Sequence, residues 1–261
     1  MINHHQLEQV CRRAGELALA QWPGGGHRLS SWDKAPGDPV CEADLAVDAF
    51  LKRELGALLP QAGWLSEETA DDPARLDREL VWLVDPIDGT RDFIRGRDGW
   101  AISVALVSGG QPLAGVLIAA ARGELWSARA GEGALLNGAP IAASSRAALS
   151  GARVPADALA KADRDLVAVA KPNSIALRMA MVADDRADLL ATLRWGYEWD
   201  VAAAALIARE AGASVSDAFG DGLLFNKPDP CTFGVLACAP GIHAAAVDRV
   251  AASTARLSRG G

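Results

Sequence analysis

Three apolar runs of strand length follow one another in the first half of the chain, and this feature limits the possible folds most. They cover residues 100–107, 112–119 and 124–130. Gly109-Gly110 separates the first two runs and Arg122-Gly123 the last two, as expected of tight turns. Strands that are joined by such short turns pair antiparallel. The segment therefore predicts a three-stranded antiparallel meander.

The pattern changes after about residue 150, where helix-like and strand-like segments alternate. The alternation predicts helices over 174–183, 200–211 and 241–257, and strands over 187–194, 213–217 and 233–238. Such alternation is typical of α/β layering. We therefore expect an α/β fold with an N-terminal α+β subdomain over 1–145 and a C-terminal α/β subdomain over 146–261.

The N-terminal part predicts two helices and a buried strand. Apolar residues recur at helical spacing over 6–20 and again from Glu42 onward. The stretch between these helices, 23–39, is rich in Gly and Pro and is predicted to be a loop. Farther along, residues 81–85 form a short apolar run that ends in a carboxylate. This run predicts a buried strand that brings Asp85 to a loop at its end.

Charge and composition exclude several classes of function. The 261 residues carry a net charge of −7, so the chain lacks the basic footprint of a protein that binds nucleic-acid polymers. An anionic ligand would need local positive charge, which bound metal ions can supply. The four cysteines form no CxxC pair, so free thiols are expected rather than a zinc site. No signal peptide or membrane span of roughly 20 apolar residues is evident, so we expect a cytoplasmic protein with no membrane partner.

The segment Asp85-Pro86-Ile87-Asp88-Gly89-Thr90 is the most informative part of the sequence. Asp85 ends the predicted strand, the proline fixes one φ angle, and Asp88 follows three residues after Asp85. Two carboxylates on one rigid turn, with the Ile87 carbonyl between them, predict a site for a hard cation. Mg²⁺ prefers oxygen ligands and can also hold a substrate phosphate. The segment therefore favours a functional interpretation.

Further carboxylates stand at the predicted ends of other elements. They are Glu67 and Glu68 after the apolar pair Trp64-Leu65, Asp44 at the start of the second helix, and Asp200 near the N-cap of the helix over 200–211. A single acidic residue at a helix start is commonly a plain cap, and adjacent glutamates are commonly a solvated loop. For each of these residues alone, that structural interpretation stands beside the functional one.

Together these segments resemble the inositol monophosphatase superfamily, in which Gly-Glu-Glu or Ser-Glu-Glu, DPxDGTxxF and WDxAA occur in this order. The matching segments are Ser66-Glu67-Glu68-Thr69, residues 85–93, and Trp199-Asp200-Val201-Ala202-Ala203, and Lys34 and residues 39–44 resemble the family's lysine and its V-T-x-A-D segment. The match covers nearly the whole chain. It implies an αβαβα sandwich of the inositol monophosphatase and fructose-1,6-bisphosphatase type, a homodimer, Mg²⁺ dependence and inhibition by lithium.

The resemblance also implies two to three magnesium ions in each site. Glu67, Asp85 and the Ile87 carbonyl would bind the first ion, and Asp85, Asp88 and Asp200 the second. Glu67 would hold a weaker third ion through water. Two metal ions can clamp the attacking and leaving oxygens of a phosphoryl transfer, so no His or Cys nucleophile is needed.

The catalytic and phosphate contacts follow from the same resemblance. Asp44 and Thr90 would orient and deprotonate the attacking water, and Glu67 is counted with them as catalytic. The backbone N–H groups of Gly89 and Thr90 would meet the phosphate, and Lys34 is a further expected contact. The chain is therefore expected to be a metal-dependent phosphoric monoester hydrolase that acts on a small phosphorylated metabolite.

Two positions depart from the family pattern. Cys41 stands where the family usually has Thr, which bears on the placing of Asp44. Asn173-Ser174 stands where Gly-Ser is common, which bears on how closely a ligand can approach there. Neither departure removes a predicted metal ligand.

Two segments bear on the choice of substrate. Glu198-Trp199-Asp200 and Phe225-Asn226-Lys227-Pro228 are similar to the branch that acts on 3′(2′),5′-bisphosphate nucleotides. Lys227 would pair with a second phosphate, with Arg178 or Lys171 assisting. Alternatively, Lys227 is a surface lysine in a turn, and Glu198 faces an inositol or sugar hydroxyl. A substrate such as adenosine 3′,5′-bisphosphate is favoured, with inositol 1-phosphate, histidinol phosphate and sugar phosphates as alternatives.

A family member that binds metal and ligand without turnover is an alternative of another class. Every expected carboxylate is present, which favours the enzyme, and turnover with Mg²⁺ would exclude the silent protein. A nucleic-acid-binding module is not supported, because the sequence lacks both a basic charge and an interleaving of aromatic and basic residues.

Overall fold

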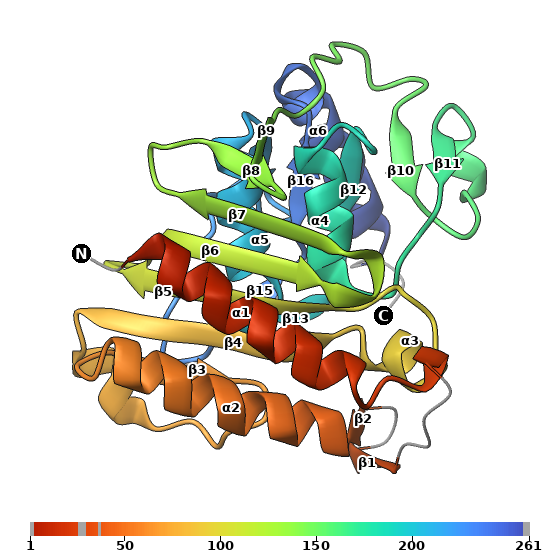
Figure 1. Cartoon of the computed structure of the whole chain (residues 1–261). Coiled ribbons are helices and arrows are strands. Elements are labelled where there is room, and N and C mark those ends of the chain that lie inside the picture. The colour runs from red at the N-terminus through yellow and green to blue at the C-terminus, as the bar shows by residue number, and fades with distance from the viewer. Residues whose placement is uncertain (1–2, 26–29, 36–37, 258–261) are drawn as a thin grey trace.

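A computed structural model describes residues 3–25, 30–35 and 38–257 of the chain (Figure 1). The helices are α1 (His4–Leu19), α2 (Glu42–Leu58), α3 (Thr90–Ile94), α4 (Ile175–Ala183), α5 (Glu198–Glu210) and α6 (His243–Leu257), with 3₁₀ turns η1 (Pro23–Gly25), η2 (Pro73–Asp77), η3 (Ala120–Arg122), η4 (Lys161–Asp163) and η5 (Pro240–Ile242). Within the described ranges, no helix is long and apolar enough to cross a membrane.

The strands form one large sheet and several small ones. The strands are β1 (Ser31–Ala35), β2 (Asp38–Cys41), β3 (Gly63–Ser66), β4 (Leu80–Asp88), β5 (Ala101–Ser108), β6 (Gln111–Ala119), β7 (Glu124–Arg129), β8 (Ala134–Leu136), β9 (Ala139–Ile141), β10 (Arg153–Pro155), β11 (Val167–Val169), β12 (Leu189–Ala191), β13 (Trp195–Tyr197), β14 (Ser214–Ser216), β15 (Cys231–Phe233) and β16 (Leu236–Cys238). The seven-stranded sheet has the order β3-β4-β5-β6-β7-β8-β9. Only β3 and β4 are parallel, and the other neighbours are antiparallel. The predicted meander, β5-β6-β7, is confirmed.

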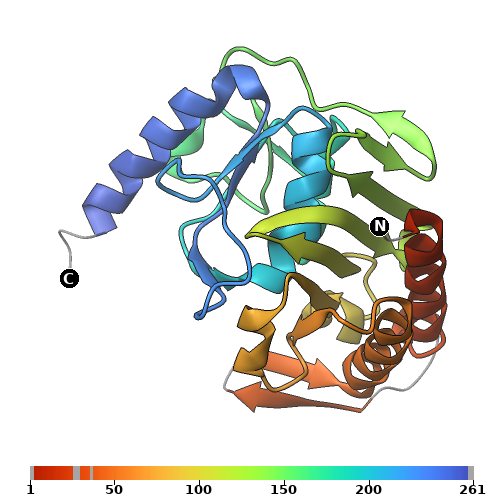
Figure 2. The ribbon, with the colours of Figure 1, turned by 90° about the vertical axis from the view of Figure 1, so that its left-hand side faces the viewer.

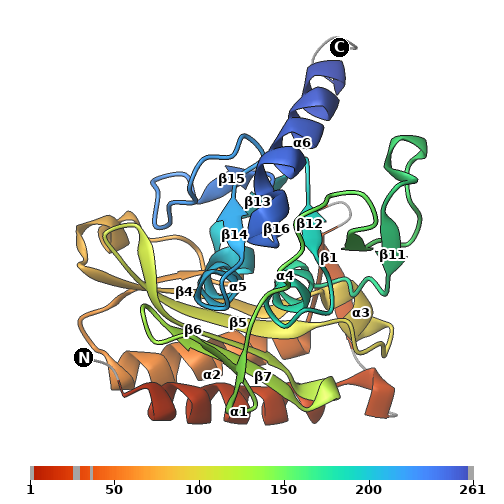
Figure 3. The same ribbon diagram turned by 90° about the horizontal axis from the view of Figure 1, so that it is seen from above.

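Helices cover both faces of the large sheet. Side chains of β4 alternate between two cores: Trp82 and Val84 pack with α1 and α2, whereas Val81 and Leu83 pack with α4 and α5. The small sheet β12-β16-β14 and α6 share a third core. Figure 3 shows the resulting order of helix pair, sheet, helix pair, small sheet and helix, and Figure 2 shows α6 at the outer side, away from α1. The predicted layered αβαβα sandwich is confirmed, whereas the division at 145/146 stays a prediction.

The contact between α5 and the large sheet is built from very small residues. Ala202, Ala203, Ala204 and Ala205 are fully buried in consecutive positions. A Cβ atom added to Gly115 in β6 would lie only 3.1 Å from the Cα atom of Ala203. The helix backbone therefore lies directly on the sheet, and this close approach fixes the height of α5 above the strands.

Three sequence-based expectations differ from the structure. The expected loop over 23–39 contains the β1-β2 hairpin, whose residues carry too few apolar side chains in alternation to predict strands. The expected strand over 233–238 is two strands, because Gly234 between them has φ +71° and a Cβ there would lie 2.4 Å from the Thr192 carbonyl oxygen. The expected strand over 187–194 is reduced to β12.

Candidate active site

The two aspartates of the DPIDGT segment lie at the end of β4. The strand continues to Asp88, but its pairing with β5 shifts between Asp85 and Asp88. The Ile87 N–H donates to Asp85 Oδ1 at 3.0 Å, so the aspartate closes a turn over the proline. Both carboxylates are buried. Asp85 lies on the sheet face that α5 covers, because it continues the alternation of Val81 and Leu83.

Gly89 is the point at which the chain turns from β4 into α3. Its φ is +96°, in the left-handed region that only glycine adopts readily. A Cβ atom here would lie 2.8 Å from the Gly99 carbonyl oxygen and 2.9 Å from the Ser174 nitrogen. The glycine therefore permits both the turn and the close approach of the segment that precedes α4.

Asp44 and Thr90 lie in contact, although they are far apart in the sequence. The Thr90 hydroxyl lies 3.2 Å from Asp44 Oδ1 and 3.0 Å from the Ile87 carbonyl oxygen, so it can donate to either. The other oxygen of Asp44 accepts from the Cys41 N–H at 2.9 Å and from the Cys41 thiol at 2.7 Å. Burial raises the pKa of Asp44 to about 6, although the donors on Cys41 and Thr90 oppose the shift.

Glu67 follows β3, the strand that lies parallel to β4. Its N–H donates to the Val84 carbonyl at 3.3 Å, which places the Glu67 backbone beside Asp85. Asp48 in α2 supports this segment, because its carboxylate accepts from the hydroxyls of Ser66 at 2.5 Å and Thr69 at 2.7 Å. No pattern in the sequence pointed to Asp48, because it occupies an ordinary position within α2.

Asp200 and Asp88 meet at the starts of α5 and α4. Asp200 lies in the first turn of α5, and the hydroxyl of Ser103 in β5 donates to the adjacent Trp199 carbonyl at 3.2 Å. Ser174 is the N-cap of α4. The Ser174 hydroxyl and the Ala176 N–H donate to Asp88 Oδ2 at 2.5 and 2.7 Å. The two helices therefore begin at the end of β4 and fix the acidic groups there.

Burial raises the pKa of three carboxylates at this point, and neighbouring negative charges add to the shift of two of them. Burial raises the pKa of Asp85 well above its usual value, and the charges of Glu67, Asp88 and Asp200 raise it further. Burial likewise raises the pKa of Asp200, with contributions from Asp88 and Glu67. The pKa of Asp88 is also raised by burial, although Ser174 and Arg178 oppose the shift. Such coupling requires like charges close together in a poorly solvated site.

The predicted metal ligands thus lie close enough to interact electrostatically, but their side chains do not surround a metal position. Across residues 3–25, 30–35 and 38–257, no three Asp, Glu, His or Cys side chains surround a point closely enough to hold a metal ion as they stand. The Glu67 carboxyl lies near Asp85, and its charge raises the pKa of Asp85. The cluster is an anionic site in which the addition of positive charge is favourable.

A polar cavity of about 430 Å³ adjoins Asp88 and Thr90. Its other lining residues are Pro39, Arg91, Lys171, Asn173, Arg178 and Arg194. Arg178 is buried and anchored, because its Nε and Nη2 donate to the Ser174 and Asn173 carbonyls at 3.2 and 2.6 Å. The exposed side chain of Arg194 makes no hydrogen bond or ion pair with another described residue. Four cations therefore face one cavity in a protein whose net charge is −7.

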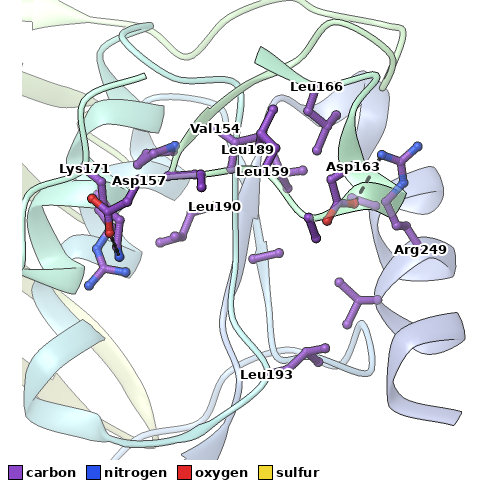
Figure 4. A pocket seen from close by; sticks show the side chains of 18 residues that line it. Val154, Asp157, Leu159, Asp163, Leu166, Lys171, Leu189, Leu190, Leu193 and Arg249 are labelled. Atoms are coloured by element: carbon purple, nitrogen blue, oxygen red, sulfur yellow. Dashed lines mark hydrogen bonds and ion pairs between the residues drawn. The ribbon is translucent and has the colours of Figure 1, made fainter. Parts of the chain in front are cut away.

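A second cavity, of about 580 Å³, shares Lys171 and Arg178 with the first. Figure 4 shows Leu159, Leu189 and Leu190 around it, with Lys171 beside Asp157 on one side and Asp163 beside Arg249 on the other. Lys171 Nζ donates to Asp157 at 2.5 Å. The walls are mainly apolar, and charged pairs lie at both sides.

Two predicted substrate contacts lie elsewhere. Glu198 is 1% exposed, and its oxygens accept from the backbone N–H groups of Asn226 at 2.5 Å and Lys227 at 3.3 Å. The Lys227 ammonium donates to the Cys231 carbonyl and lies 3.6 Å from Glu198. Neither residue lines the polar cavity. The side chain of Lys34 lies outside the described part of the structure.

The sequence therefore identified most of the acidic site but missed much of its surroundings. The structure brings Asp44, Glu67, Asp85, Asp88 and Thr90 together around the end of β4, with Asp200 close to them. Arg91 and Arg194 were not predicted, because an isolated arginine carries no periodic or spacing signal. The sequence signal available for these two residues was their position next to the predicted site segments. Arg91 directly follows the DPIDGT segment, and Arg194 lies a few residues before Trp199-Asp200.

Comparisons with known proteins agree with this arrangement. The model of the inositol monophosphatase family matches residues 4–256. Inositol monophosphatase 2 of Solanum lycopersicum is 33% identical over 81% of this chain and 86% of its own length. The 3′(2′),5′-bisphosphate nucleotidase CysQ of Shigella flexneri is 32% identical over 81% of this chain and 90% of its own length. The solved structure of the Thermotoga maritima IMPase has a TM-score of 0.83 at 26% identity, and the match covers 95% of this chain and 96% of that one. The chain thus belongs to the inositol monophosphatase family and is a phosphatase, an enzyme that hydrolyses phosphate monoesters.

Proposed function

We propose that the protein is a Mg²⁺-dependent phosphomonoesterase whose preferred substrates are 3′(2′),5′-bisphosphate nucleotides such as adenosine 3′,5′-bisphosphate. The observation that carries the proposal is the cationic wall of the polar cavity, formed by Arg91, Lys171, Arg178 and Arg194. A phosphate at the carboxylate cluster does not need this wall if metal ions neutralise it. The cations of the wall could then bind a second phosphate on the same substrate, since guanidinium and ammonium groups both bind phosphate. Lys171 would exchange its partner Asp157 for that phosphate.

The carboxylate cluster fits magnesium. Its donors are hard oxygens, and the pKa values of Asp85, Asp88 and Asp200 are raised, as expected where anions lack sufficient positive charge. Glu67, Asp85 and the Ile87 carbonyl would hold one ion, and Asp85, Asp88 and Asp200 another, with a weaker third ion held by Glu67 through water. Because the side chains do not form a cage as they stand, binding would require them to rotate. When bound, magnesium would act as a Lewis acid that neutralises phosphoryl charge and favours ionisation of water.

Asp44 and Thr90 are suited to orient the nucleophile. As a carboxylate, Asp44 can accept the Thr90 hydroxyl proton across the 3.2 Å contact, and the Thr90 oxygen can then accept a proton from water. Cys41 fixes the other Asp44 oxygen, so the carboxylate presents one oxygen to Thr90. The pair thereby positions water at the end of β4 and receives its proton.

The second cavity favours a nucleotide over a smaller phosphate ester as the substrate. It meets the cationic wall at Lys171 and Arg178, and its apolar lining could cover a nucleobase attached to the phosphate-bearing sugar (Figure 4). In this arrangement Arg178 and Lys171 keep their expected substrate role, whereas Lys227 is occupied by the Cys231 carbonyl. Gly89 and Thr90 backbone N–H groups remain the proposed contacts of the scissile phosphate.

A single panel tests the proposal. Phosphate release is measured with and without Mg²⁺ from adenosine 3′,5′-bisphosphate, inositol 1-phosphate, histidinol phosphate and fructose 1,6-bisphosphate. We expect kcat/KM for the nucleotide to exceed the others by at least about tenfold, which corresponds to ~1.4 kcal/mol of transition-state stabilisation. A preference for inositol 1-phosphate would support the alternative suggested by the 33%-identical plant relative. If no phosphate were released from any of the four substrates, a family member that binds ligand without turnover would be favoured.

Arg194→Gln isolates the second-phosphate contact. We expect it to lower kcat/KM for the bisphosphate by about tenfold, the usual worth of one hydrogen bond to a charged group, and to leave inositol 1-phosphate nearly unchanged. Arg209→Gln, at the opposite end of α5 from Asp200, is the matched control. Equal losses on both substrates would assign Arg194 to the scissile phosphate or to folding instead.

A further inference from the structure

Arg75 is a buried arginine outside the predicted site. It lies in η2, on the segment that follows Glu67, and is only 2% exposed. Its Nε and Nη2 donate to the two oxygens of Asp71 at 2.6 and 2.9 Å. A guanidinium is costly to bury, so such a residue is retained only where its fork of donors is well used.

The same guanidinium reaches a loop that is distant in the sequence. Nη1 donates to Asn226 Oδ1 at 2.5 Å, and Nη2 donates to the Lys227 carbonyl at 2.9 Å. Asn226 has φ +60°, which is uncommon for a residue with a side chain. The surrounding contacts must therefore hold this turn, and Arg75 supplies two of them.

The Asn226–Lys227 turn holds the Glu198 side chain. The N–H groups of Asn226 and Lys227 both donate to the Glu198 carboxylate, and Glu198 begins α5, two residues before Asp200. At the other end, the Arg75 backbone packs directly on β3, since a Cβ at Gly63 would lie 3.1 Å from Arg75 Cα. Contacts of Arg75 thus connect the strand that leads to Glu67 with the start of α5.

We propose that Arg75 is a positioning residue, which fixes the Asn226–Lys227 turn and, through it, the Glu198 side of the active site. Its three nitrogens bond in three directions, and a lysine cannot reproduce this planar fork. Glu198 does not line the polar cavity, but only β13 separates it from Arg194, which does. Because Ser103 separately anchors the start of α5 through the Trp199 carbonyl, the role concerns the placing of Arg194, and so of the substrate, more than the chemistry. Loss of the fork should therefore raise KM more than it lowers kcat.

Three single variants, and the double variant that combines two of them, test the proposal on the panel substrate that the wild-type enzyme hydrolyses best. Arg75→Lys removes the fork and keeps the charge. Asn226→Gly removes the side-chain acceptor and keeps a residue that tolerates φ +60°. Arg153→Lys is the matched control, because Arg153 also forks onto aspartates, Asp188 and Asp185, outside the site. Melting temperatures are measured with kcat and KM for each variant.

We expect Arg75→Lys to raise KM by about tenfold with kcat changed by less than about threefold, the pattern of lost ground-state binding. Arg153→Lys should lower the melting temperature comparably and leave KM unchanged. The Arg75→Lys/Asn226→Gly double variant should be no worse than Arg75→Lys alone, because both changes break one linkage. If the effects of Arg75→Lys and Asn226→Gly on KM were additive, or if Arg75→Lys raised KM no more than Arg153→Lys does, the positioning role of Arg75 would be overturned. Since variants are compared on one substrate, the outcome is independent of which phosphate ester is preferred.

Discussion

One carboxylate oxygen of Asp88 accepts two hydrogen bonds, and together they fix the orientation of this side chain. The Ser174 hydroxyl and the Ala176 N–H both point at Oδ2. The spacing of the DPIDGT segment predicted that Asp88 is functional, but not that the start of α4 supplies its partners. Those partners come from residues 86 and 88 positions away, and a contact of that kind leaves no pattern in the local sequence.

Asp88→Asn separates the charge of this residue from its shape. Asparagine can still present a carbonyl oxygen to the two donors, so we expect a folded protein with turnover lower by on the order of 10²-fold or more. Circular dichroism and kcat are measured together, with Asp248→Asn on α6 as the control. Near-normal kcat in the folded variant would remove Asp88 from the proposed metal site.

Cys41→Ala tests how the departure from the family's threonine acts on Asp44. The thiol donates to Asp44 and favours its charged form, so its loss should raise the pKa of Asp44 above about 6. Because the carboxylate form is the proton acceptor, activity should fall at a higher pH on the acidic side. The shift should be less than about one pH unit, since a thiol is a weak donor.

The pH dependence of kcat/KM is the measurement, and Cys11→Ala, which removes a buried thiol of α1, is the control. An unmoved acidic limb would mean that Asp44 does not govern it. A uniform drop at all pH values would point to packing instead.

Elements with strong periodicity were predicted well, and those set by distant contacts were not. α1 and α2 agree with the expected segments because their apolar spacing defines one buried face, whereas α4, α5 and β5 agree because they are nearly continuous apolar runs that are buried on almost all sides. Strands such as β13 and β15 are three residues long, and each depends on the other for its pairing. So short a segment has no period to detect, and the sequence of either strand alone could not have shown it.

Gly89→Ala tests the turn from β4 into α3. The variant meets both a positive φ and a backbone oxygen 2.8 Å from its Cβ. Gly131→Ala is the control, because its φ is +80° but nothing lies within 4 Å of the added atom. We expect the control to cost about 1 kcal/mol of unfolding free energy and Gly89→Ala to cost roughly 2 kcal/mol more, with loss of activity. Urea unfolding measures both, and equal costs would show that the close approach is not limiting.

At the scale of the molecule, the family resemblance predicted the layers, and pattern reasoning alone would have stopped at α/β. A polar network that no motif marks joins Ser144 and β10 to the start of β12. Asp188 accepts from Ser144 at 2.7 Å and from the Arg153 side chain and backbone at 2.8–2.9 Å. The homodimer, lithium inhibition and cytoplasmic location stay predictions.

Asp188→Asn tests this network through its pH dependence. Hydrogen bonds from Arg153 hold the pKa of Asp188 well below its usual value. A depressed folded-state pKa stabilises the protein above the unfolded-state pKa of about 3.9, and the contribution is lost as the pH falls below it. The variant should lose about 3 kcal/mol at pH 7, as expected when a buried ion pair loses one charge.

Because the wild type loses the same contribution in acid, the two unfolding free energies should converge below about pH 4. Urea unfolding between pH 2 and 8 measures them. Asp157→Asn, which removes an exposed ion pair, should match the wild type throughout. A constant gap between Asp188→Asn and wild type at all pH values would mean that packing, not charge, is lost.

The alanine run of α5 has a consequence for how this enzyme tolerates change. The methyl groups of this run and the bare backbone of Gly115 act as a spacer of fixed thickness between the sheet, in which β4 carries Asp85 and Asp88, and α5, whose first turn carries Asp200. A Cβ atom added at Gly115 would push α5 away from the sheet and move Asp200 with it, although no polar residue had been replaced. The geometry of the active site is therefore set partly by small apolar residues that never meet the substrate.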